Sequence, residues 1–217
     1  MANQFIYGRQ PVAEAERGRR GVHRVWRAPE TSGVELERLC GSPDHQGVVA
    51  EVDPYPYGDP VGLLRGENAL LVALDEVQDP RNLGAVCRSA EVAGAAGVIV
   101  PERRAAAVTP VACKTSAGAV EHLQVAHVRN LADWLAQAKE ACFWIWGADA
   151  DAESAPWEVD LKGPTVLVLG GEGKGLRPRV AATCDGLIAL PQRGQIDSLN
   201  VSAAATALLF EALRQRS

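Results

Sequence analysis

The sequence predicts an α/β protein built on a parallel sheet that helices cover on both faces. From Ala69 onward, short apolar runs alternate with longer segments whose small and apolar residues recur at helical spacing. Strands that alternate with helices in this way are typical of parallel sheets. The composition agrees with a packed core, because 47% of the residues are hydrophobic and only 23% are charged.

The expected strands of this sheet are short runs of apolar and often β-branched residues. They cover residues 69–75, 97–101, 123–128, 142–149, 164–170 and 187–190. The expected helices between them cover residues 81–95, 109–120 and 130–141. A last apolar helix follows the polar stretch "PQRGQIDSLN", in which Asp197, Ser198 and Asn200 are each suited to cap its first turn.

The first part of the chain is expected to form a separate small α/β unit. Its helices and strands alternate, and they cover residues 11–18, 21–28, 33–41 and 46–52. The stretch that follows is rich in Pro and Gly and has no apolar period, which is typical of a linker. The expected organisation is therefore a small domain at 1–53, a linker at 54–68 and a larger domain at 69–217.

Several classes of protein are excluded by the composition. No apolar run approaches the ~20 residues of a membrane-spanning helix, and the start "MANQFIYGRQ" lacks the apolar core of a signal peptide. We therefore expect a cytoplasmic protein. The five cysteines contain no C-x-x-C pair and the four histidines no H-x-x-x-H pair, so neither a disulfide framework nor a metal site is expected.

The charge is unevenly distributed along the chain. The net charge of -5 argues against a general nucleic-acid binder. Residues 1–28 nevertheless contain six Arg and only two Glu. This segment is either a solvated arginine-rich surface or a local patch that contacts phosphates. The candidates for such contacts are Arg9, Arg19, Arg20 and Arg24.

Three loops follow expected strands, where ligands bind in parallel α/β sheets. They read "DEVQDPRNLGAVCRSA", "VLGGEGKGLRP" and "LPQRGQIDSLNVSAAA". The second has four glycines within residues 170–175, more than one tight turn needs, which would allow a ligand close to the backbone. Its spacing matches neither a G-x-x-x-x-G-K-[ST] phosphate loop nor the G-x-G-x-x-G dinucleotide fingerprint, which argues against a dehydrogenase.

In the first loop, Asn82 and Arg88 have two interpretations each. Asn82 is either a helix cap or a binding residue, and Arg88 is either a surface charge or part of a site. Their spacing of six residues spans about 1.7 helical turns, so both reach one pocket only if Asn82 lies at its edge. Arg88 lies among apolar residues, where a cation more often has a specific partner. The residues alone leave both interpretations open.

Taken together, the three loops resemble the SpoU/TrmH branch of the SPOUT RNA methyltransferases. The stretches "DPRNLGAVCRSA", "LVLGGEGKGL" and "LPQRGQIDSLNVSAAATALLFEA" occur in the family's order over roughly residues 70–215. The stretches "DHQGVVAEV" and "CKTSAGAVEHLQVAHVRNL" are further similar to the bacterial 23S rRNA guanosine 2′-O-methyltransferases. The stretch "YGRQPVAEA" resembles the start of that group's L30e-like substrate-binding domain.

This resemblance implies a fold, a cofactor and a set of site residues. The second and third loops would form a deep trefoil knot that binds S-adenosyl-L-methionine, and two chains would form a homodimer through the knot region. The residues that would bind the cofactor are Gly170, Gly171, Leu190 and Leu199. The residues of the reacting site would be Asn82, Arg88, Glu172, Ser198 and Asn200. The family's chemistry requires no metal.

The implied reaction is the attack of a ribose 2′-oxygen of RNA on the methyl group of the cofactor. The protein must align the two groups and manage the hydroxyl proton. A guanidinium has a pKa above ~12 and no acceptor, so it is a poor general base. We therefore expect Arg88 to contact a phosphate of the RNA and to stabilise the developing alkoxide. Asn82 and Glu172 would hold it, while Ser198 and Asn200 shape the pocket.

The target RNA is the less determined part of the prediction. The motifs favour a guanosine of 23S rRNA, but a tRNA 2′-O-methyltransferase shares the three loops. A knotted RNA-binding protein without catalysis is a further alternative. The unit at about residues 5–53 looks shorter than an L30e-like domain, which leaves its RNA specificity open.

Overall fold

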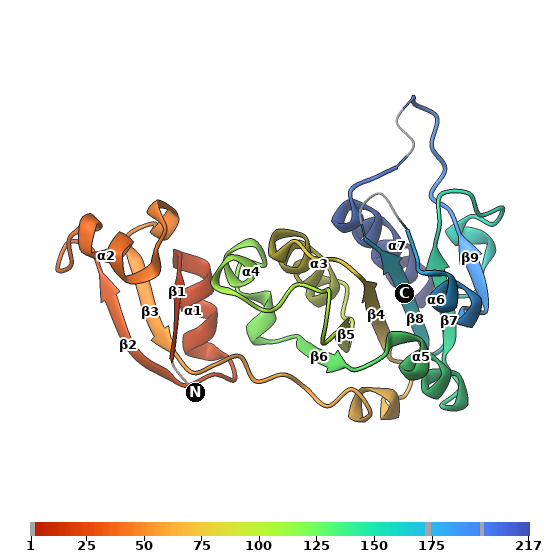
Figure 1. Ribbon diagram of the computed structural model, residues 1–217, viewed down its shortest axis with the longest axis horizontal. Coiled ribbons are helices and arrows are strands. Elements are labelled where there is room, and N and C mark those ends of the chain that lie inside the picture. The colour runs from red at the N-terminus through yellow and green to blue at the C-terminus, as the bar shows by residue number, and fades with distance from the viewer. Residues whose placement is uncertain (1–2, 172–174, 196–197) are drawn as a thin grey trace.

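The computed structural model describes residues 3–171, 175–195 and 198–217, and it contains two sheets that lie side by side (Figure 1). The smaller sheet is antiparallel with the order β1-β3-β2. Its strands are β1 (Gln4–Tyr7), β2 (Val22–Arg27) and β3 (Val48–Val52). The helices α1 (Arg9–Arg17) and α2 (Gly33–Cys40) and the short 3₁₀ helix η1 (Pro43–His45) complete this unit.

The larger sheet has the order β6-β5-β4-β8-β7-β9, and all its neighbouring strands are parallel. Its strands are β4 (Leu70–Asp75), β5 (Gly97–Pro101), β6 (Gln124–Val128), β7 (Trp144–Ala148), β8 (Thr165–Gly170) and β9 (Gly186–Ile188). Its helices are α3 (Pro80–Val92), α4 (Pro110–Thr115), α5 (Leu131–Glu140), α6 (Pro178–Thr183) and α7 (Val201–Arg216). Short 3₁₀ helices are η2 (Gly62–Arg65), η3 (Ala119–Glu121) and η4 (Pro156–Glu158). The predicted parallel α/β class is confirmed.

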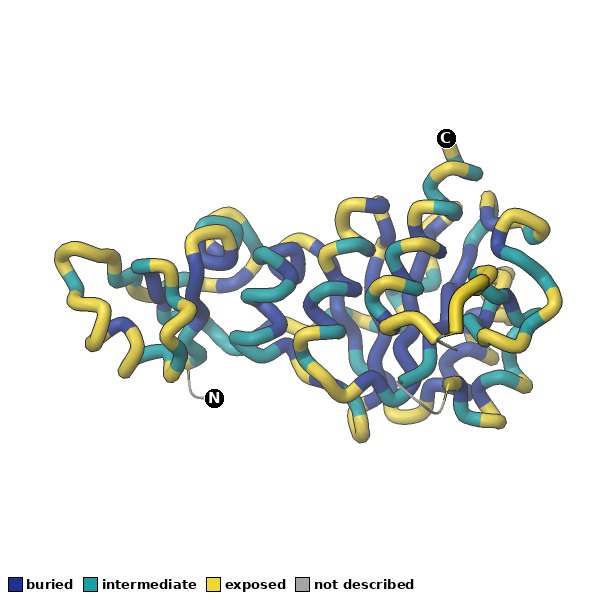
Figure 2. The backbone as a smooth tube through the Cα atoms, turned by 90° about the horizontal axis from the view of Figure 1, so that it is seen from above, coloured by how far each residue is buried: buried dark blue, intermediate teal, exposed yellow. Residues whose placement is uncertain are grey.

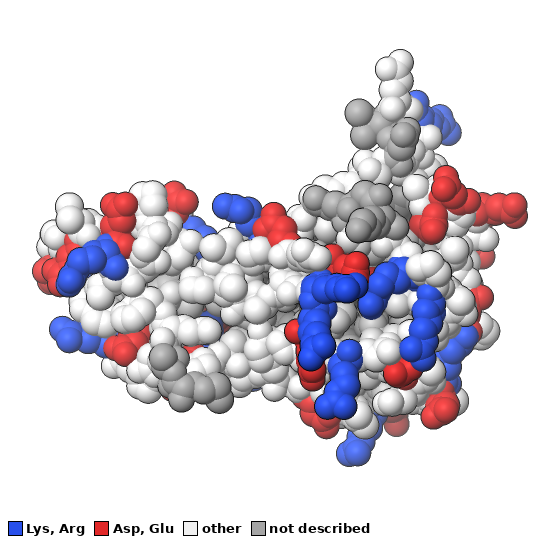
Figure 3. Space-filling model, in the orientation of Figure 1, with Lys and Arg blue, Asp and Glu red and all other residues white. Residues whose placement is uncertain are grey.

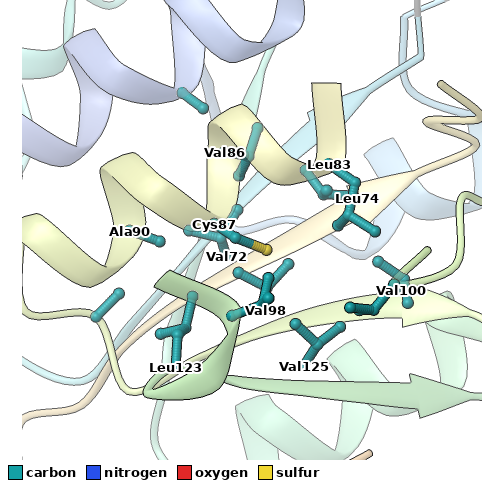
Figure 4. Packing of buried hydrophobic residues seen from close by; sticks show 14 of the residues in the cluster. Val72, Leu74, Leu83, Val86, Cys87, Ala90, Val98, Val100, Leu123 and Val125 are labelled. Carbon is teal, nitrogen blue, oxygen red and sulfur yellow. The ribbon is translucent and has the colours of Figure 1, made fainter. Parts of the chain in front are cut away.

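Helices cover both faces of the larger sheet. On β4, Val72 and Leu74 point to a core that includes residues of α3, α4 and α7, whereas Leu71 and Ala73 point to a core that includes residues of α5 and α6. Figure 4 shows Val72 and Leu74 packed against side chains of α3, β5 and β6. A strand buried on both faces reads as a continuous apolar run, which explains the pattern in the sequence.

The expected elements agree with the structure except in a few places. The expected helix at 109–120 ends at Thr115, because Ala117 and Gly118 both have positive φ and interrupt it. Neither β1 nor α6 was expected. Both are short, with four and six residues, and a period is hard to detect over such a length.

Residues 54–68, the expected linker, pack along the outer edge of the larger sheet. Gly58 pairs with Ala126 of β6 in a parallel bridge. The buried hydroxyl of Tyr55 donates to the carbonyl oxygen of Val120 or Leu123, at 3.0 and 3.1 Å. The segment therefore connects the two units while it also covers the open edge of β6.

The small unit docks on the larger one through a buried ion pair and a shared apolar core. Arg20 forms a bidentate pair with Glu121 of η3, and its guanidinium also contacts the Sγ atom of Cys113. Burial is the largest single influence on the pKa of Arg20 and lowers it, but the interactions with Glu121 and Cys113 together raise this pKa overall. Ile6 and Val12 join the core of the larger sheet. The prediction that Arg20 contacts RNA is wrong, because its guanidinium is sealed between the units.

Burial along the backbone follows this arrangement. Figure 2 shows that the buried segments are concentrated in the strands of the larger unit, while the far end of the small unit, around α2, is largely exposed. No helix in the described part of the chain is long and apolar enough to cross a membrane. The described residues also contain no group of three or more His, Cys, Asp or Glu that could hold a metal ion.

Candidate active site

A cavity of about 680 Å³ lies at the carboxyl ends of β7, β8 and β9 and the start of α7. Six of the predicted site residues line it, which brings the second and third loops together at one place. They are Gly170, Gly171, Leu190, Ser198, Leu199 and Asn200. The prediction that these loops share a pocket is supported by this geometry.

The walls of this larger cavity are apolar and acidic. Leu169, Ile188 and Leu208 supply apolar surface, and Asp149 and Asp151 follow β7 at its mouth. No Lys or Arg is found among the described residues that line the cavity. Phosphate groups would therefore meet carboxylates here, whereas a ligand with positive charge and a flat apolar ring would be complemented.

Two of the glycines are required because chain segments approach each other closely. A Cβ atom on Gly170 would lie 2.1 Å from the carbonyl carbon of Gly175. A Cβ atom on Gly171 would lie 2.6 Å from the carbonyl oxygen of Glu76. Gly175 itself has a φ of 62°, which favours glycine. The glycines that suggested a ligand site thus also allow the end of β8 to lie against the backbone of Gly175 and Glu76.

A smaller cavity of about 500 Å³ adjoins the first and shares Gly171 and Gly175 with it. Its other walls come from the loop between β4 and α3 and from the start of α6, including Glu76, Asn82 and Arg177. The two cavities together could place two reactants on either side of the glycine-rich loop. We therefore expect one reactant in the larger cavity and the group that accepts the transferred methyl in the smaller cavity.

Asn200 connects the two cavities and also caps α7. Its side-chain amide donates to the Oδ1 atom of Asn82 at 3.1 Å. Its own Oδ1 accepts from the backbone N–H of Ser202 at 2.9 Å and from the Ser202 hydroxyl at 2.6 Å. The cap prediction is confirmed for Asn200, because its oxygen satisfies the start of α7. Its nitrogen bonds Asn82 at the start of α3, and its role in the reacting site stays a prediction.

Arg88 is an exposed residue of α3 that the sequence placed in the reacting site. It is absent from the described lining of both cavities. The face of α3 that meets α7 carries Ser89, whose hydroxyl bonds that of Thr206 at 2.7 Å, and Asn82 one heptad earlier. Arg88 is rotated about 100° from Ser89 around the helix. Among the described residues, Asn82 thus lines the smaller cavity and Arg88 lines neither, while Glu172 and Asp197 lie outside the described residues.

Arg177 is a site residue that the sequence did not reveal. Its backbone N–H and its Nε atom donate to the fully buried carboxylate of Asp75, at 2.8 and 2.7 Å. The hydrogen bond to Asp75 outweighs burial and raises the pKa of Arg177 above its usual value. The sequence feature that could have indicated such a partner is Asp75, which ends a continuous apolar run. A carboxylate that is buried in this way needs a partner with positive charge or N–H donors.

The remaining arginines of the small unit differ in their surroundings. Arg19 donates to the carbonyl oxygens of Glu121 and Leu123, so it too helps to join the units. Arg24 lies over the ring of Trp26, 4.9 Å from its centroid, and Arg9 bonds the carbonyl oxygen of Gln46. Arg9 and Arg24 are exposed on the surface, which is compatible with a contact to RNA.

The chain belongs to the SpoU rRNA Methylase family, which matches residues 69–210. YacO of Bacillus subtilis (strain 168), a TrmH family protein named as a tRNA/rRNA methyltransferase, is 36% identical over 241 aligned positions. These cover 99% of this chain and 97% of YacO. The alignment exceeds the 217 residues of this chain, so YacO carries at least 24 residues that this chain lacks.

Other relatives are longer, and solved structures share the fold. An uncharacterized tRNA/rRNA methyltransferase of Mycolicibacterium vanbaalenii is 44% identical over 84% of this chain, which spans only 60% of that protein's length. The SpoU methyltransferase AviRb of Streptomyces viridochromogenes, solved with AdoMet, is 28% identical with a TM-score of 0.84, covering 99% of this chain and 91% of AviRb. An RNA 2′-O ribose methyltransferase structure is 27% identical with the same TM-score, covering 99% and 89%.

The cofactor of this RNA methyltransferase family is S-adenosylmethionine, and the larger cavity fits it. The cofactor carries a sulfonium and an ammonium group against one carboxylate, so Asp149 and Asp151 complement its net positive charge. Leu190 and Leu199 offer apolar surface to an adenine ring. Gly170 and Gly171 expose backbone groups at the wall, so the sequence prediction of this cofactor is confirmed.

Proposed function

We propose that this protein transfers a methyl group from S-adenosylmethionine to a ribose 2′-oxygen of RNA, with a guanosine of 23S rRNA as the leading substrate. The observation that carries the proposal is the pair of adjoining cavities that share Gly171 and Gly175. The larger one fits the cofactor, and the smaller one provides a polar wall for the acceptor ribose. A relative of the same fold is an RNA 2′-O ribose methyltransferase, which supports the choice of atom.

The residues of this chain would act mainly by positioning. The cofactor supplies an activated methyl group when it is bound, so the protein need not generate an electrophile. Asn82 and Asn200, which bond each other, would fix the loop that faces the ribose. Ser198 lines the cofactor cavity beside them and would contact the reacting groups. Precise alignment of two reactants is a large source of rate enhancement.

Arg88 and Glu172 belong to the proposal as residues that complete the site in the working assembly. Arg88 would contact an RNA phosphate and stabilise the alkoxide, as a preorganised cation does. We also propose a cytoplasmic homodimer whose chains pair through a trefoil knot formed by the second and third loops. Exposed apolar side chains on α3, α7 and the third loop support such a surface, namely Val92, Phe210 and Leu199.

The small unit would select the RNA. We propose that it is a shortened L30e-like domain whose Arg9, Arg19 and Arg24 contact the substrate. The small unit contains a three-stranded sheet and two helices. The whole chain lacks at least 24 residues that YacO carries. Both observations support a reduced domain. Specific RNA recognition would then depend on shape more than on base edges.

The proposal is tested by incubating the full chain with methyl-labelled S-adenosylmethionine and separate pools of unmodified 23S rRNA, 16S rRNA and tRNA. Digestion to nucleosides then identifies the labelled group. Label on a ribose of 23S rRNA supports the proposal in full. Label on a ribose of tRNA supports the reaction but replaces the substrate, which the tRNA/rRNA naming of relatives keeps as the second candidate. Label on a base, or bound cofactor without transfer, contradicts the proposed reaction.

A further inference from the structure

The carboxyl edge of the larger sheet carries arginines on the loops after β6 and β5, beside the loop after β4. Arg129 follows β6 directly, Arg103 and Arg104 follow β5, and Glu76, which pairs with Arg104, follows β4. Figure 3 shows Lys and Arg side chains gathered on the face of the larger unit that carries α5 and α6. This concentration is unexpected in a protein whose net charge is -5.

The strand register places these loops in one row. Val128 pairs with Pro101, and Asp75 pairs with Gly170. Ala73 pairs with Ile99, so Asp75 and Pro101, each two residues further on, stand at the same level. The row therefore runs from β6 through β5 and β4 to the glycine-rich loop after β8. Three strand spacings of ~4.8 Å make it roughly 14 Å long, ending at the two cavities.

The arginines of this row are available to a ligand. Arg103 and Arg129 are exposed and have no ion-pair partner in the described part of the chain. Arg104 is 75% exposed, and one nitrogen lies 3.4 Å from Glu76, which leaves most of its donors unused. Arg104 and Glu76 both have left-handed backbone with φ of 58°, which is uncommon for residues other than glycine and clusters at functional sites.

Acidic groups lie on the same edge, and part of their charge is already engaged within the protein. Glu76 lies between Arg104 and Arg177, and Glu102 follows Pro101. The buried carboxylate of Asp75 is already engaged by Arg177. Asp79, also exposed in the loop after β4, caps α3 by accepting from the backbone N–H of Arg81. Three exposed guanidinium groups therefore face solvent beside the shared carboxylate of Glu76 and the exposed carboxylates of Glu102 and Asp79. Guanidinium groups that are spaced along an edge suit the phosphates of an RNA strand, because each offers several donors in one plane.

We propose that the carboxyl edge from β6 to β4 is the surface on which the RNA backbone lies as it enters the acceptor cavity, with Arg129, Arg103 and Arg104 contacting phosphates. The inference rests on the proposed function and specifies where that reaction's substrate binds. It adds phosphate contacts on the larger unit to those proposed for Arg9, Arg19 and Arg24 of the small unit.

The test compares the wild-type protein with the double variant Arg103→Ala/Arg129→Ala. Binding of a 23S rRNA transcript is measured by filter retention over a series of KCl concentrations. Each lost phosphate contact lowers the slope of log affinity against log salt by about 0.7 to 0.9, so the double variant should lose about 1.4 to 1.8. We expect RNA affinity to fall by about tenfold at physiological salt, with KM for RNA raised more than kcat is lowered. S-adenosylmethionine affinity should stay within about twofold, since neither residue lines the larger cavity.

The matched control is Arg65→Ala/Arg214→Ala, which removes the same charge from exposed positions in η2, before the amino end of β4, and near the end of α7. Arg214 lies thirteen residues after Val201, so it is roughly 20 Å along the helix from the cavity. A control that weakens binding as much as the edge variant overturns the inference. So does an edge variant with unchanged slope beside an Arg9→Ala/Arg24→Ala variant that loses its slope. In either case, methyl transfer by the wild-type protein still supports the proposed function. Wild-type protein that neither binds nor methylates RNA contradicts the proposed function and the proposed RNA-binding edge together.

Discussion

Two arginine–carboxylate pairs in this protein have nearly the same chemistry and very different surroundings. Arg20 pairs with Glu121, and Arg177 pairs with Asp75, and both carboxylates are fully buried. The side chain of Arg20 is only 1% exposed, whereas that of Arg177 is 41% exposed. The first pair seals the small unit against the larger one, and the second holds the end of β4 to the segment before α6, beside the acceptor cavity.

The difference shows that the role of an arginine depends on whether water and ligands can reach its remaining donors. All the polar partners of Arg20 are in the protein, so this side chain can contribute only to stability and docking. Arg177 pairs with the buried carboxylate of Asp75 through Nε and one terminal nitrogen, and its other terminal nitrogen lies 3.8 Å from Glu76. Arg177 is also among the residues that line the smaller cavity. Substitutions at the two sites should therefore separate a structural effect from a functional one.

Arg20→Ala should have the largest effect on stability. It leaves the carboxylate of Glu121 buried without a partner, which typically costs about 3–5 kcal/mol of the free energy of unfolding. Denaturation in urea, followed by tryptophan fluorescence, measures the loss. The double variant Arg20→Met/Glu121→Leu should recover most of it, because the buried charge is then gone.

Arg17→Ala is the matched control for this change. Arg17 is 73% exposed and pairs with Glu14 at 3.4 Å on the same helix, so its removal should cost less than about 1 kcal/mol. If Arg20→Ala lowered the free energy of unfolding no more than Arg17→Ala, water would have to reach the carboxylate of Glu121. The conclusion that this ion pair is buried between the two units would then be wrong.

Arg177→Ala should have the second largest effect, and it should act on function as well. Asp75 again loses its partner, but water can enter where the exposed guanidinium stood, so we expect about 2–3 kcal/mol. Because Arg177 lines the smaller cavity, methyl transfer should fall by more than the loss of folded protein explains. Urea denaturation and initial rates on RNA measure the two effects.

Arg177→Lys sharpens this prediction because it keeps the charge but removes the Nε donor and the fork geometry. It should retain more stability than Arg177→Ala while the rate stays low. A rate that recovers in full with Lys would show that the charge alone matters. An equal loss of stability in Arg20→Ala and Arg177→Ala would mean that exposure does not distinguish the pairs.

Asn200 should give a smaller effect that separates helix capping from site geometry. Asn200→Ala removes the cap of α7, which costs about 1 kcal/mol, and also the bond to Asn82. Asn200→Ser keeps a good cap but has no amide nitrogen to reach Asn82. We expect near wild-type stability for Asn200→Ser and a lowered methyl-transfer rate for both variants. A normal rate in Asn200→Ser would leave capping as the only role of this residue.

Much of the fold could be predicted from the sequence, because buried parallel strands such as Leu70–Asp75 have a pattern that few other structures produce. The resemblance to the family also named four residues, Gly170, Gly171, Leu190 and Leu199, that the structure brings to one cavity. The use of charged side chains was not. Arg20 and Arg24 look alike in the sequence, yet one is buried and the other exposed. Their partners lie up to about a hundred residues away, and no local pattern encodes such a pairing.

The pair of Glu211 and Arg214 on α7 should show the smallest effect, at the exposed end of the series. Hydrogen bonds from Arg214 and Gln215 lower the pKa of Glu211 to about 2. A carboxylate whose folded pKa is depressed stabilises the protein above its unfolded pKa of about 4.3, and this contribution disappears as the pH falls through about 2. Glu211→Gln should therefore be slightly less stable than wild type at pH 7, by less than the Asn200→Ala loss, with a smaller difference at pH 3. Urea denaturation at both pH values measures it, and a difference that grows on acidification would contradict the assigned pairing. Water screens the Arg214–Glu211 pair, so its loss should cost little free energy of unfolding. A loss of stability as large as that of Arg177→Ala would show that exposure of the arginine does not determine how much each of the three pairs contributes.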